Sequence, residues 1–204
     1  MSDSRRDAPR ASADLVRQRL LESAGLLEAS VEPCADAIAA AAQLLCEALR
    51  DGRRVLTFGN GGSAADAQHF AAELSGRFGR ERAALPALAL TANSSDVTAI
   101  ANDYGYERVF ARLVEAHGAA GDVAVGISTS GESANVCEGV RAARDAGLHT
   151  LALTGRGGGK LAGLADRSIV VPSDVTARIQ EVHGVAIHVL CEIVEETLLG
   201  GEFA

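Results

Sequence analysis

The stretch Val55–Phe78, VLTFGNGGSAADAQHFAAELSGRF, constrains the fold more than any other part of the chain. A short apolar run that favours β structure is followed at once by GNGGS, whose glycines cannot continue a strand. Ser63 is a good helix N-cap, and Asp66 completes an S-x-x-D capping box with it. The sequence therefore predicts a strand, a tight turn and a helix, with free backbone N–H groups that suit an anion such as phosphate.

Further apolar runs alternate with helical segments along the rest of the chain. The predicted strands after the first are 87–91, 123–127, 150–154 and 169–171. The predicted helices that follow the one after the GNGGS turn are 94–102, 106–117, 132–146, 160–164 and 177–199. This alternation indicates an α/β fold, a three-layer sandwich in which a central parallel sheet of about five strands is flanked by helices. Ligands of such sheets bind beyond the carboxyl ends of the strands, so the loops there are the candidate site.

Two helices are predicted ahead of the first strand, at 12–29 and 34–50, with Pro33 as the break between them. Residues 1–11 are predicted to be a disordered tail, which leaves 12–204 as a single domain. The alanine-rich second helix fits either a cover for the sheet or a contact between subunits, and the sequence alone leaves both open.

Composition argues against several functional classes. The formal net charge of −8 disfavours binding to nucleic acid or to an anionic membrane surface. No apolar run approaches the ~20 residues of a membrane span, and no apolar signal region follows the polar start. The cysteines form no C-x-x-C motif and are expected to be buried, reduced thiols. We therefore expect a cytoplasmic protein.

Hydroxyl groups gather directly after the strand at 123–127, in the run STSGES. Hydroxyls and free N–H groups can surround the terminal oxygens of a phosphomonoester without a cation. Alone, this loop fits a serine-capped turn equally well, but the GNGGS loop at the same edge of the sheet favours phosphate binding. GNGGSA also fits the dinucleotide pattern G-x-G-x-x-A, yet the acidic residue that this pattern requires is missing. The later run TGRGGGK has no Walker spacing and is predicted to be a flexible surface loop.

His69 and Glu73 lie four residues apart and so share one face of the first predicted helix after the turn. By themselves they are more typical of a surface pair than of metal ligands or an acid/base pair. The last helix carries Gln180, His183 and His188 among Val, Ile and Leu, and buried polar side chains need partners. One histidine is expected to be functional and the other structural, and the helix geometry does not decide between them.

Several longer motifs then point to one family. GNGGSAADAQHFAAEL, IANDYGYERVF, GISTSGESANV, ALTG and RIQEVHGVAIHVL occur in the order seen in the sedoheptulose 7-phosphate isomerases. The chain resembles these phosphoheptose isomerases, which belong to the sugar isomerase (SIS) domain class, from about residue 15 to residue 199. The resemblance implies an SIS-type fold, a homotetramer with active sites at subunit contacts, and conversion of D-sedoheptulose 7-phosphate to D-glycero-D-manno-heptose 7-phosphate, the first step toward activated heptose.

The resemblance also implies roles for individual residues. Contacts to the sugar and its phosphate fall on Asn60, Gly61, Gly62, Ser63, Glu73, Asn102, Asp103, Ser128, Thr129, Ser130, Ser133 and Gln180. The zinc site, one ion per subunit, falls on His69, Glu73, Gln180 and His188. Glu73 and His188 are also the implied acid/base pair, so the resemblance favours His188 over His183.

Two positions depart from the family pattern, and three other functions stay open. Ala72 stands where a second acid is common, and Glu132 places a negative charge beside the proposed phosphate loop. One alternative is a tetrameric replication-initiator-binding protein of the same class, which the resemblance implies lacks the acid at Glu73 and the histidine at His188. The others are an isomerase for a different ketose phosphate and a sugar-phosphate-sensing regulatory domain, for which no DNA-binding segment is present.

Overall fold

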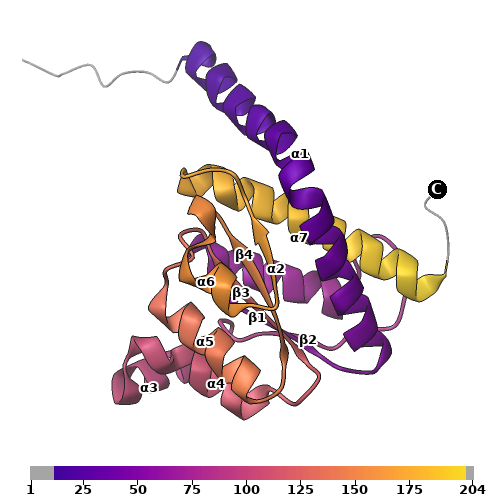
Figure 1. The fold of residues 1–204 in the computed structure, drawn as a ribbon, viewed down its shortest axis with the longest axis vertical. Helices are drawn as coiled ribbons and strands as arrows, with labels where there is room; N and C mark the ends of the chain where they lie inside the picture. The colour runs from indigo at the N-terminus through magenta and orange to yellow at the C-terminus, as the bar shows by residue number, and fades with distance from the viewer. Residues whose placement is uncertain (1–11, 201–204) are drawn as a thin grey trace, which may run out of the picture.

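The computed structural model describes residues 12–200, and the predicted tail at 1–11 lies outside them, as do residues 201–204. A five-stranded sheet of order β2-β1-β3-β4-β5 forms the middle layer, and every neighbouring pair of strands is parallel. The strands are β1 (Val55–Gly59), β2 (Ala87–Ala89), β3 (Val123–Ser128), β4 (His149–Thr154) and β5 (Arg167–Val170). The predicted three-layer α/β sandwich is confirmed (Figure 1).

Helices cover both faces of this sheet. One layer consists of α1 (Ala13–Arg50), α2 (Gly62–Ser75) and α7 (Thr176–Leu199). The opposite layer consists of α3 (Ser94–Tyr104), α4 (Val109–His117), α5 (Ala134–Asp145) and α6 (Gly159–Leu164). Two 3₁₀ turns, η1 (Tyr106–Arg108) and η2 (Arg156–Gly158), precede α4 and α6.

The central strand β3 is buried on both faces. Val123, Val125 and Ile127 belong to the apolar cluster shared with α1, α2 and α7, whereas Ala124 belongs to the cluster on the other side. Gly126 also faces the second side, where an added Cβ would lie 3.0 Å from both Val136 and Val140 of α5. Because apolar side chains fix the strand from both faces, the loop that follows Ser128 leaves the sheet from a rigid position.

The prediction of two helices ahead of the first strand is wrong, because the single helix α1 runs through Pro33. Pro33 is exposed, so the carbonyl group left without its N–H partner can bind water instead. Packing holds the helix on either side of it: Leu27 contacts the cluster around Ile179, and the Sγ atom of Cys34 lies 3.6 Å from the carbonyl oxygen of Val170. Tertiary contacts therefore override the local break.

The predicted capping box at the start of α2 is also wrong. The helix begins at Gly62 after Gly61, which has a φ of 54°, and no side chain caps it. This left-handed glycine turn starts the helix early and places Ser63 inside its first turn. Asp66 does not reach back, and its Oδ2 atom is buried without a hydrogen-bond partner. The first turn of α2 thus has no side-chain acceptor of its own.

The run TGRGGGK is not an open loop, contrary to its prediction. It forms η2 and the start of α6, and it packs against Gly131 of the STSGES loop. Gly131 has a φ of 65°, and a Cβ there would lie 2.1 Å from the carbonyl oxygen of Gly158. The backbone N–H of Leu161 donates to the carbonyl oxygen of Gly131 at 2.9 Å. The hydroxyl-rich loop is therefore braced by its neighbour.

The four cysteines are buried free thiols, as predicted. Burial raises the pKa of Cys191 to about 12, which keeps this thiol protonated and unreactive. Within residues 12–200, no helix combines the length and the apolar character that a membrane-spanning segment needs.

His183 is fully buried beneath β4. Its Nε2 atom lies 3.0 Å from the carbonyl oxygen of Thr154, so it donates its proton there and the ring is neutral. Burial lowers the pKa of His183 to about 4, although the hydrogen bond to Thr154 acts in the opposite direction. His183 is thus a histidine of the core.

This burial predicts a pH-dependent stability. Between the ordinary pKa of 6.5 and the folded value of about 4, the unfolded chain binds a proton at position 183 that the folded chain does not. The free energy of unfolding should therefore fall, by about 3 kcal/mol in all, as the pH drops through this range. Chemical denaturation at several pH values should show a shallower dependence of the unfolding free energy on pH for His183→Gln than for the unmodified chain. Equal slopes for His183→Gln and the unmodified chain would contradict this account.

Candidate functional site

Two loops meet at the carboxyl edge of the sheet. β1 and β3 pair from Val55 to Gly59, so the GNGGS and STSGES loops leave the sheet side by side. With the first turns of α7 they line a cavity of about 290 Å³. Its lining residues are Asn60, Gly61, Gly62, Ser63, Ile127, Ser128, Thr129, Ser133, Thr176 and Gln180. Most of the predicted substrate contacts are therefore brought together, and Thr176 is added to them.

Four predicted contacts lie outside this lining, and one of them, Glu73, belongs to the second cluster described below. The Oγ atom of Ser130 accepts a hydrogen bond from the backbone N–H of Glu132 at 3.2 Å and lies beside the cavity. Asn102 and Asp103 lie on the exposed end of α3, where the Asn102 amide donates to the Asp103 carboxylate at 2.8 Å. The described chain does not bring these two side chains to the cavity.

The cavity offers neutral hydrogen-bond donors and two helix N-termini. Ser133 is the N-cap residue of α5, yet its hydroxyl makes no capping bond and instead lies 2.9 Å from the Oγ atom of Ser128. The uncapped start of α2 lies on the other side, at Gly62. Because helix N-termini carry partial positive charge and free N–H groups, this arrangement suits a phosphate group.

The side chain of Asn60 is held by two residues that the sequence did not single out. Its Nδ2 atom donates to Oδ1 of Asn135 at 2.8 Å, and its Oδ1 atom accepts from Nδ2 of Asn135 at 2.9 Å and from the Tyr106 hydroxyl at 2.8 Å. The amide is thus bound on both sides, and the backbone of Asn60–Gly62 is left to face a ligand. Only the fold could reveal this network, because its members come from three separate segments.

Charged residues near the hydroxyl-rich loop are balanced. The Lys160 ammonium lies 2.7 Å from the Glu132 carboxylate. Hydrogen bonding between these two residues lowers the pKa of Glu132 and raises that of Lys160. The negative charge that the sequence placed beside the phosphate loop is therefore paired. Arg156 donates to the Thr176 hydroxyl at 3.0 Å, which places a cation just behind the cavity lining. Arg156 has a φ of 49°, a strained value for a residue other than glycine.

A second cluster forms where α7 crosses α2. The Nε2 atom of His188 lies 3.4 Å from Nε2 of His69, which in turn lies 2.9 Å from Oε1 of Glu73. The two imidazole rings meet edge to face, and the ring of Phe78 lies 5.3 Å from that of His188. All three polar side chains remain accessible to a ligand, because the side chains of His69 and Glu73 are 43% and 23% exposed and His188 is exposed.

Gln180 connects the cavity to this cluster. It lines the cavity and lies about two turns before His188 on the same helix. Its amide packs so closely on Gly62 that a Cβ at Gly62 would lie 2.4 Å from Nε2 of Gln180. A side chain at position 62 would therefore displace the Gln180 amide from its place at the cavity.

The cluster fits zinc by the chemistry of its donors. Within residues 12–200, no group of three or more His, Cys, Asp and Glu side chains is already arranged around a metal position. The two imidazole nitrogens, 3.4 Å apart, nevertheless have the spacing of two ligands on one tetrahedral zinc ion, roughly 3.3 Å for ordinary Zn–N bonds. Glu73 would exchange its hydrogen bond to His69 for the metal.

Comparison with known proteins relates this chain to the SIS domain family and to phosphoheptose isomerases. A model of the SIS domain family matches residues 20–155. The phosphoheptose isomerase of Aquifex aeolicus is 55% identical over 181 residues, which cover 89% of this chain and 95% of that protein. Phosphoheptose isomerase 1 of Campylobacter jejuni is 52% identical over 184 residues, 90% of this chain and 98% of its own. The structure of a phosphoheptose isomerase from Neisseria gonorrhoeae matches with a TM-score of 0.85 and 45% identity, over 90% of this chain and 98% of the other.

The cavity predicts a measurable difference between two serines. Ser133→Ala removes a lining hydroxyl and should weaken binding of inorganic phosphate about tenfold, the effect of one hydrogen bond to a charged group. Ser130→Ala, beside the cavity, should change the affinity by less than about twofold. Titration calorimetry with phosphate measures both. Equal losses for the two variants would show that the cavity is not where the anion binds.

Proposed function

Because this chain belongs to the SIS-domain family of phosphoheptose isomerases, it is a sugar-phosphate isomerase, and we propose that Glu73 and His188 carry its proton transfers. Its reaction converts D-sedoheptulose 7-phosphate, a ketose, into the aldose D-glycero-D-manno-heptose 7-phosphate. Glu73 and His188 both contact His69, and they lie on the two helices whose first turns line the cavity suited to phosphate, which supports these roles.

The interconversion requires two proton movements. The Glu73 carboxylate takes a proton from C1 of the open-chain ketose while His188 gives a proton to the oxygen on C2, which yields an enediol. His188 then takes the proton from the oxygen on C1, and Glu73 returns its proton to C2, which gives the aldehyde. Each group ends in its starting state, so the cycle is balanced.

The phosphate group supplies orientation in this proposal. Ser63 and Glu73 lie on one helix, ten residues or roughly 15 Å apart along its axis. A phosphate held at the start of α2 therefore leaves an open seven-carbon chain directed along the helix toward the His69, Glu73 and His188 cluster. Binding energy from the remote phosphate then positions the reacting carbons against the acid/base pair.

We propose that His69, Glu73, Gln180 and His188 hold one zinc ion per subunit. The donor types and the spacing of the two imidazole nitrogens support this assignment. A bound zinc ion supplies Lewis acidity at the sugar oxygens. Gln is a weak zinc ligand, so we expect exchangeable binding, and Glu73 and His188 move protons only while they are released from the ion.

The zinc proposal predicts a loss of bound metal. His69→Ala removes one nitrogen ligand and should lower zinc content after zinc loading and desalting from about one ion per subunit to well below half of that. Elemental analysis by mass spectrometry measures the content, with His183→Gln as the control histidine variant. Equal zinc in His69→Ala and in the unmodified protein would rule out this site.

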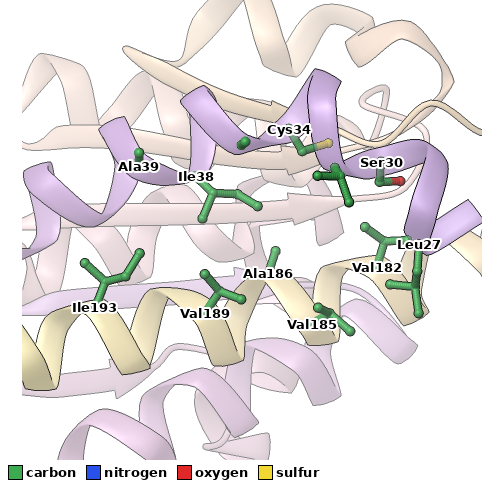
Figure 2. Close-up of a pocket in the computed structure, with 12 residues that line it drawn as sticks. Leu27, Ser30, Cys34, Ile38, Ala39, Val182, Val185, Ala186, Val189 and Ile193 are labelled. Carbon is green, nitrogen blue, oxygen red and sulfur yellow. The ribbon is translucent and has the colours of Figure 1, made fainter. Parts of the chain in front are cut away.

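We propose a homotetramer in which the face formed by α1 and α7 contacts other copies of the chain. These helices flank a groove of about 310 Å³ with an almost wholly apolar lining, including Ile38, Val185 and Val189 (Figure 2). Exposed Leu20, Leu21 and Val31 extend the apolar surface along α1. The tetrameric state of the family that the sequence resembles supports the proposal, and a monomeric mass in light scattering would contradict it.

A cytoplasmic location remains our proposal for this chain. A phosphorylated metabolite as substrate and four free thiols support it. Recovery of the native protein from another cell fraction would count against it.

The acid/base assignment predicts a sharp ranking of variants. Glu73→Gln and His188→Gln should keep the fold and lower kcat by about 10²- to 10⁴-fold, because each removes a group that moves a proton. His183→Gln, at the buried histidine, should reduce kcat far less. Conversion of sedoheptulose 7-phosphate, followed by detection of the aldoheptose product, gives the rates. A wild-type rate for Glu73→Gln, or a larger loss for His183→Gln than for His188→Gln, would overturn the assignment.

A further inference from the structure

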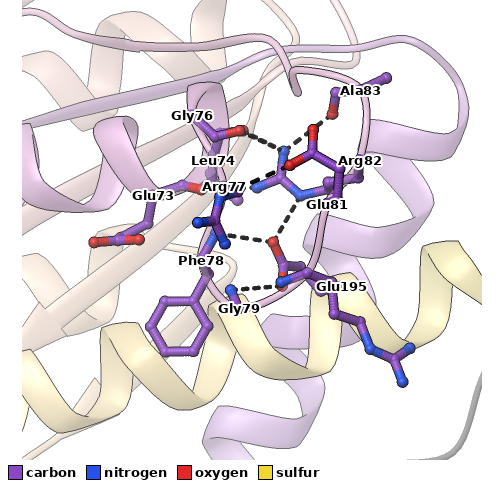
Figure 3. Close-up of polar contacts among 11 residues, drawn as sticks. Glu73, Leu74, Gly76, Arg77, Phe78, Gly79, Glu81, Arg82, Ala83 and Glu195 are labelled. Atoms are coloured by element: carbon purple, nitrogen blue, oxygen red, sulfur yellow. Dashed lines mark hydrogen bonds and ion pairs between the residues drawn. The ribbon is translucent and has the colours of Figure 1, made fainter.

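A buried ion pair joins the loop after α2 to the last helix. The Nε atom of Arg82 lies 2.8 Å from the Glu195 carboxylate, and the two side chains are 3% and 4% exposed (Figure 3). Two charges buried in this way need further hydrogen bonds to offset the cost of removing them from water. Both residues make such hydrogen bonds, and the partners of each residue show which part of the chain it holds in place.

Glu195 fixes the loop from the side of α7. Its carboxylate accepts hydrogen bonds from three successive backbone N–H groups, those of Phe78, Gly79 and Arg80, at 2.8–2.9 Å. Burial raises the pKa of Glu195, but these three bonds and the one from Arg82 outweigh burial and lower it. The carboxylate therefore stays charged at neutral pH and clamps the loop.

Arg82 fixes the end of α2 from the other side. Its guanidinium donates to the carbonyl oxygens of Glu73 at 2.7 Å and Leu74 at 2.8 Å, within the last turn of the helix. It also donates to Gly76 at 3.2 Å and Ala83 at 3.1 Å, in the chain that follows. The last carbonyls of a helix lack partners within it, so this arginine serves as the C-terminal cap of α2.

Both ends of this pair lead to the acid/base residues. Arg82 binds the backbone of Glu73 itself, whereas the Glu73 carboxylate points away from the guanidinium (Figure 3). Glu195 lies about two turns beyond His188 on the same side of α7. The loop that it clamps carries Phe78, whose ring lies 5.3 Å from the His188 ring.

We propose that Arg82 and Glu195 are positioning residues that hold Glu73 and His188 in register for proton transfer, through the backbone of α2 and the ring of Phe78. The proposal rests on the roles assigned above to Glu73 and His188. Neither Arg82 nor Glu195 touches the substrate in this account. Their loss should therefore lower kcat and leave KM, which depends on the distant phosphate cavity, nearly unchanged.

A second buried carboxylate provides a matched control. Asp122 accepts backbone N–H bonds from Arg54 at 2.9 Å and from Ala119 at 3.0 Å, and it also pairs with an arginine. It precedes β3 and so lies at the amino edge of the sheet, opposite the cavity. Asp122→Asn and Glu195→Gln are equivalent changes in chemistry, and only the second concerns the acid/base pair.

The test compares steady-state kinetics of Glu195→Gln, Phe78→Leu and Asp122→Asn in the zinc-loaded, full-length protein. Glu195→Gln should lower kcat roughly 10- to 100-fold, the effect of a displacement of about 1 Å, with KM within about twofold. Phe78→Leu leaves the ion pair intact and should reproduce the loss in kcat, so the proposal stays testable if Glu195→Gln fails to fold. Asp122→Asn should lower the unfolding temperature without changing kcat.

The NMR signal of the His188 ring reports on positioning without reference to turnover. It should shift in Glu195→Gln and in Phe78→Leu, because the aromatic ring beside it moves or is lost, and it should stay in place in Asp122→Asn. Unchanged kcat in both Glu195→Gln and Phe78→Leu would overturn the proposal, as would an equal loss of kcat in Asp122→Asn. A shifted His188 signal together with full activity in Glu73→Gln would instead refute the acid/base assignment.

Discussion

The crossing of α7 over α2 is the contact on which the whole site depends. Phe70 and Leu74 of α2 share one apolar cluster with Ile187 and Leu190 of α7. Each polar residue of the proposed acid/base cluster is the direct neighbour of one of these buried residues: His69 precedes Phe70, Glu73 precedes Leu74, and His188 follows Ile187. The packing of the core therefore sets where these exposed side chains meet. Burial of the apolar residues fixes the positions of the polar side chains on the surface above them.

The sheet provides the second half of the site by the same logic. Parallel pairing of β1 with β3 places two helix N-termini at one edge, where neutral donors can hold a phosphate. Arg156 places a cation just outside the cavity lining, whereas Lys160 and Glu132 neutralise each other. The cavity is thus suited to an anion held by a preformed backbone arrangement, with one positive charge nearby.

Much of the fold and of the candidate site was predictable from the sequence, because periodicity and turn chemistry are local properties. The order of strands and helices, the parallel sheet and the two loops at its carboxyl edge follow from alternating apolar runs and glycine turns. The choice between His183 and His188 did not follow from helix geometry, and only the resemblance favoured His188. The structure separates them by burial, with His183 bound to the Thr154 carbonyl in the core and His188 beside His69.

The rest could not be predicted because it depends on contacts distant in sequence. Pro33 stays within a helix since packing on both sides outweighs its local preference, and the Asn60, Asn135 and Tyr106 network joins three separate segments.

The uninterrupted α1 also constrains the length of the chain before Pro33. In a continuous helix, unlike in a loop, inserting or deleting a single residue between Leu21 and Pro33 would rotate Leu20 and Leu21 by about 100° and shift them by about 1.5 Å along the axis. The length of this segment is therefore as constrained as its composition, and changes in multiples of a heptad would be the least disruptive.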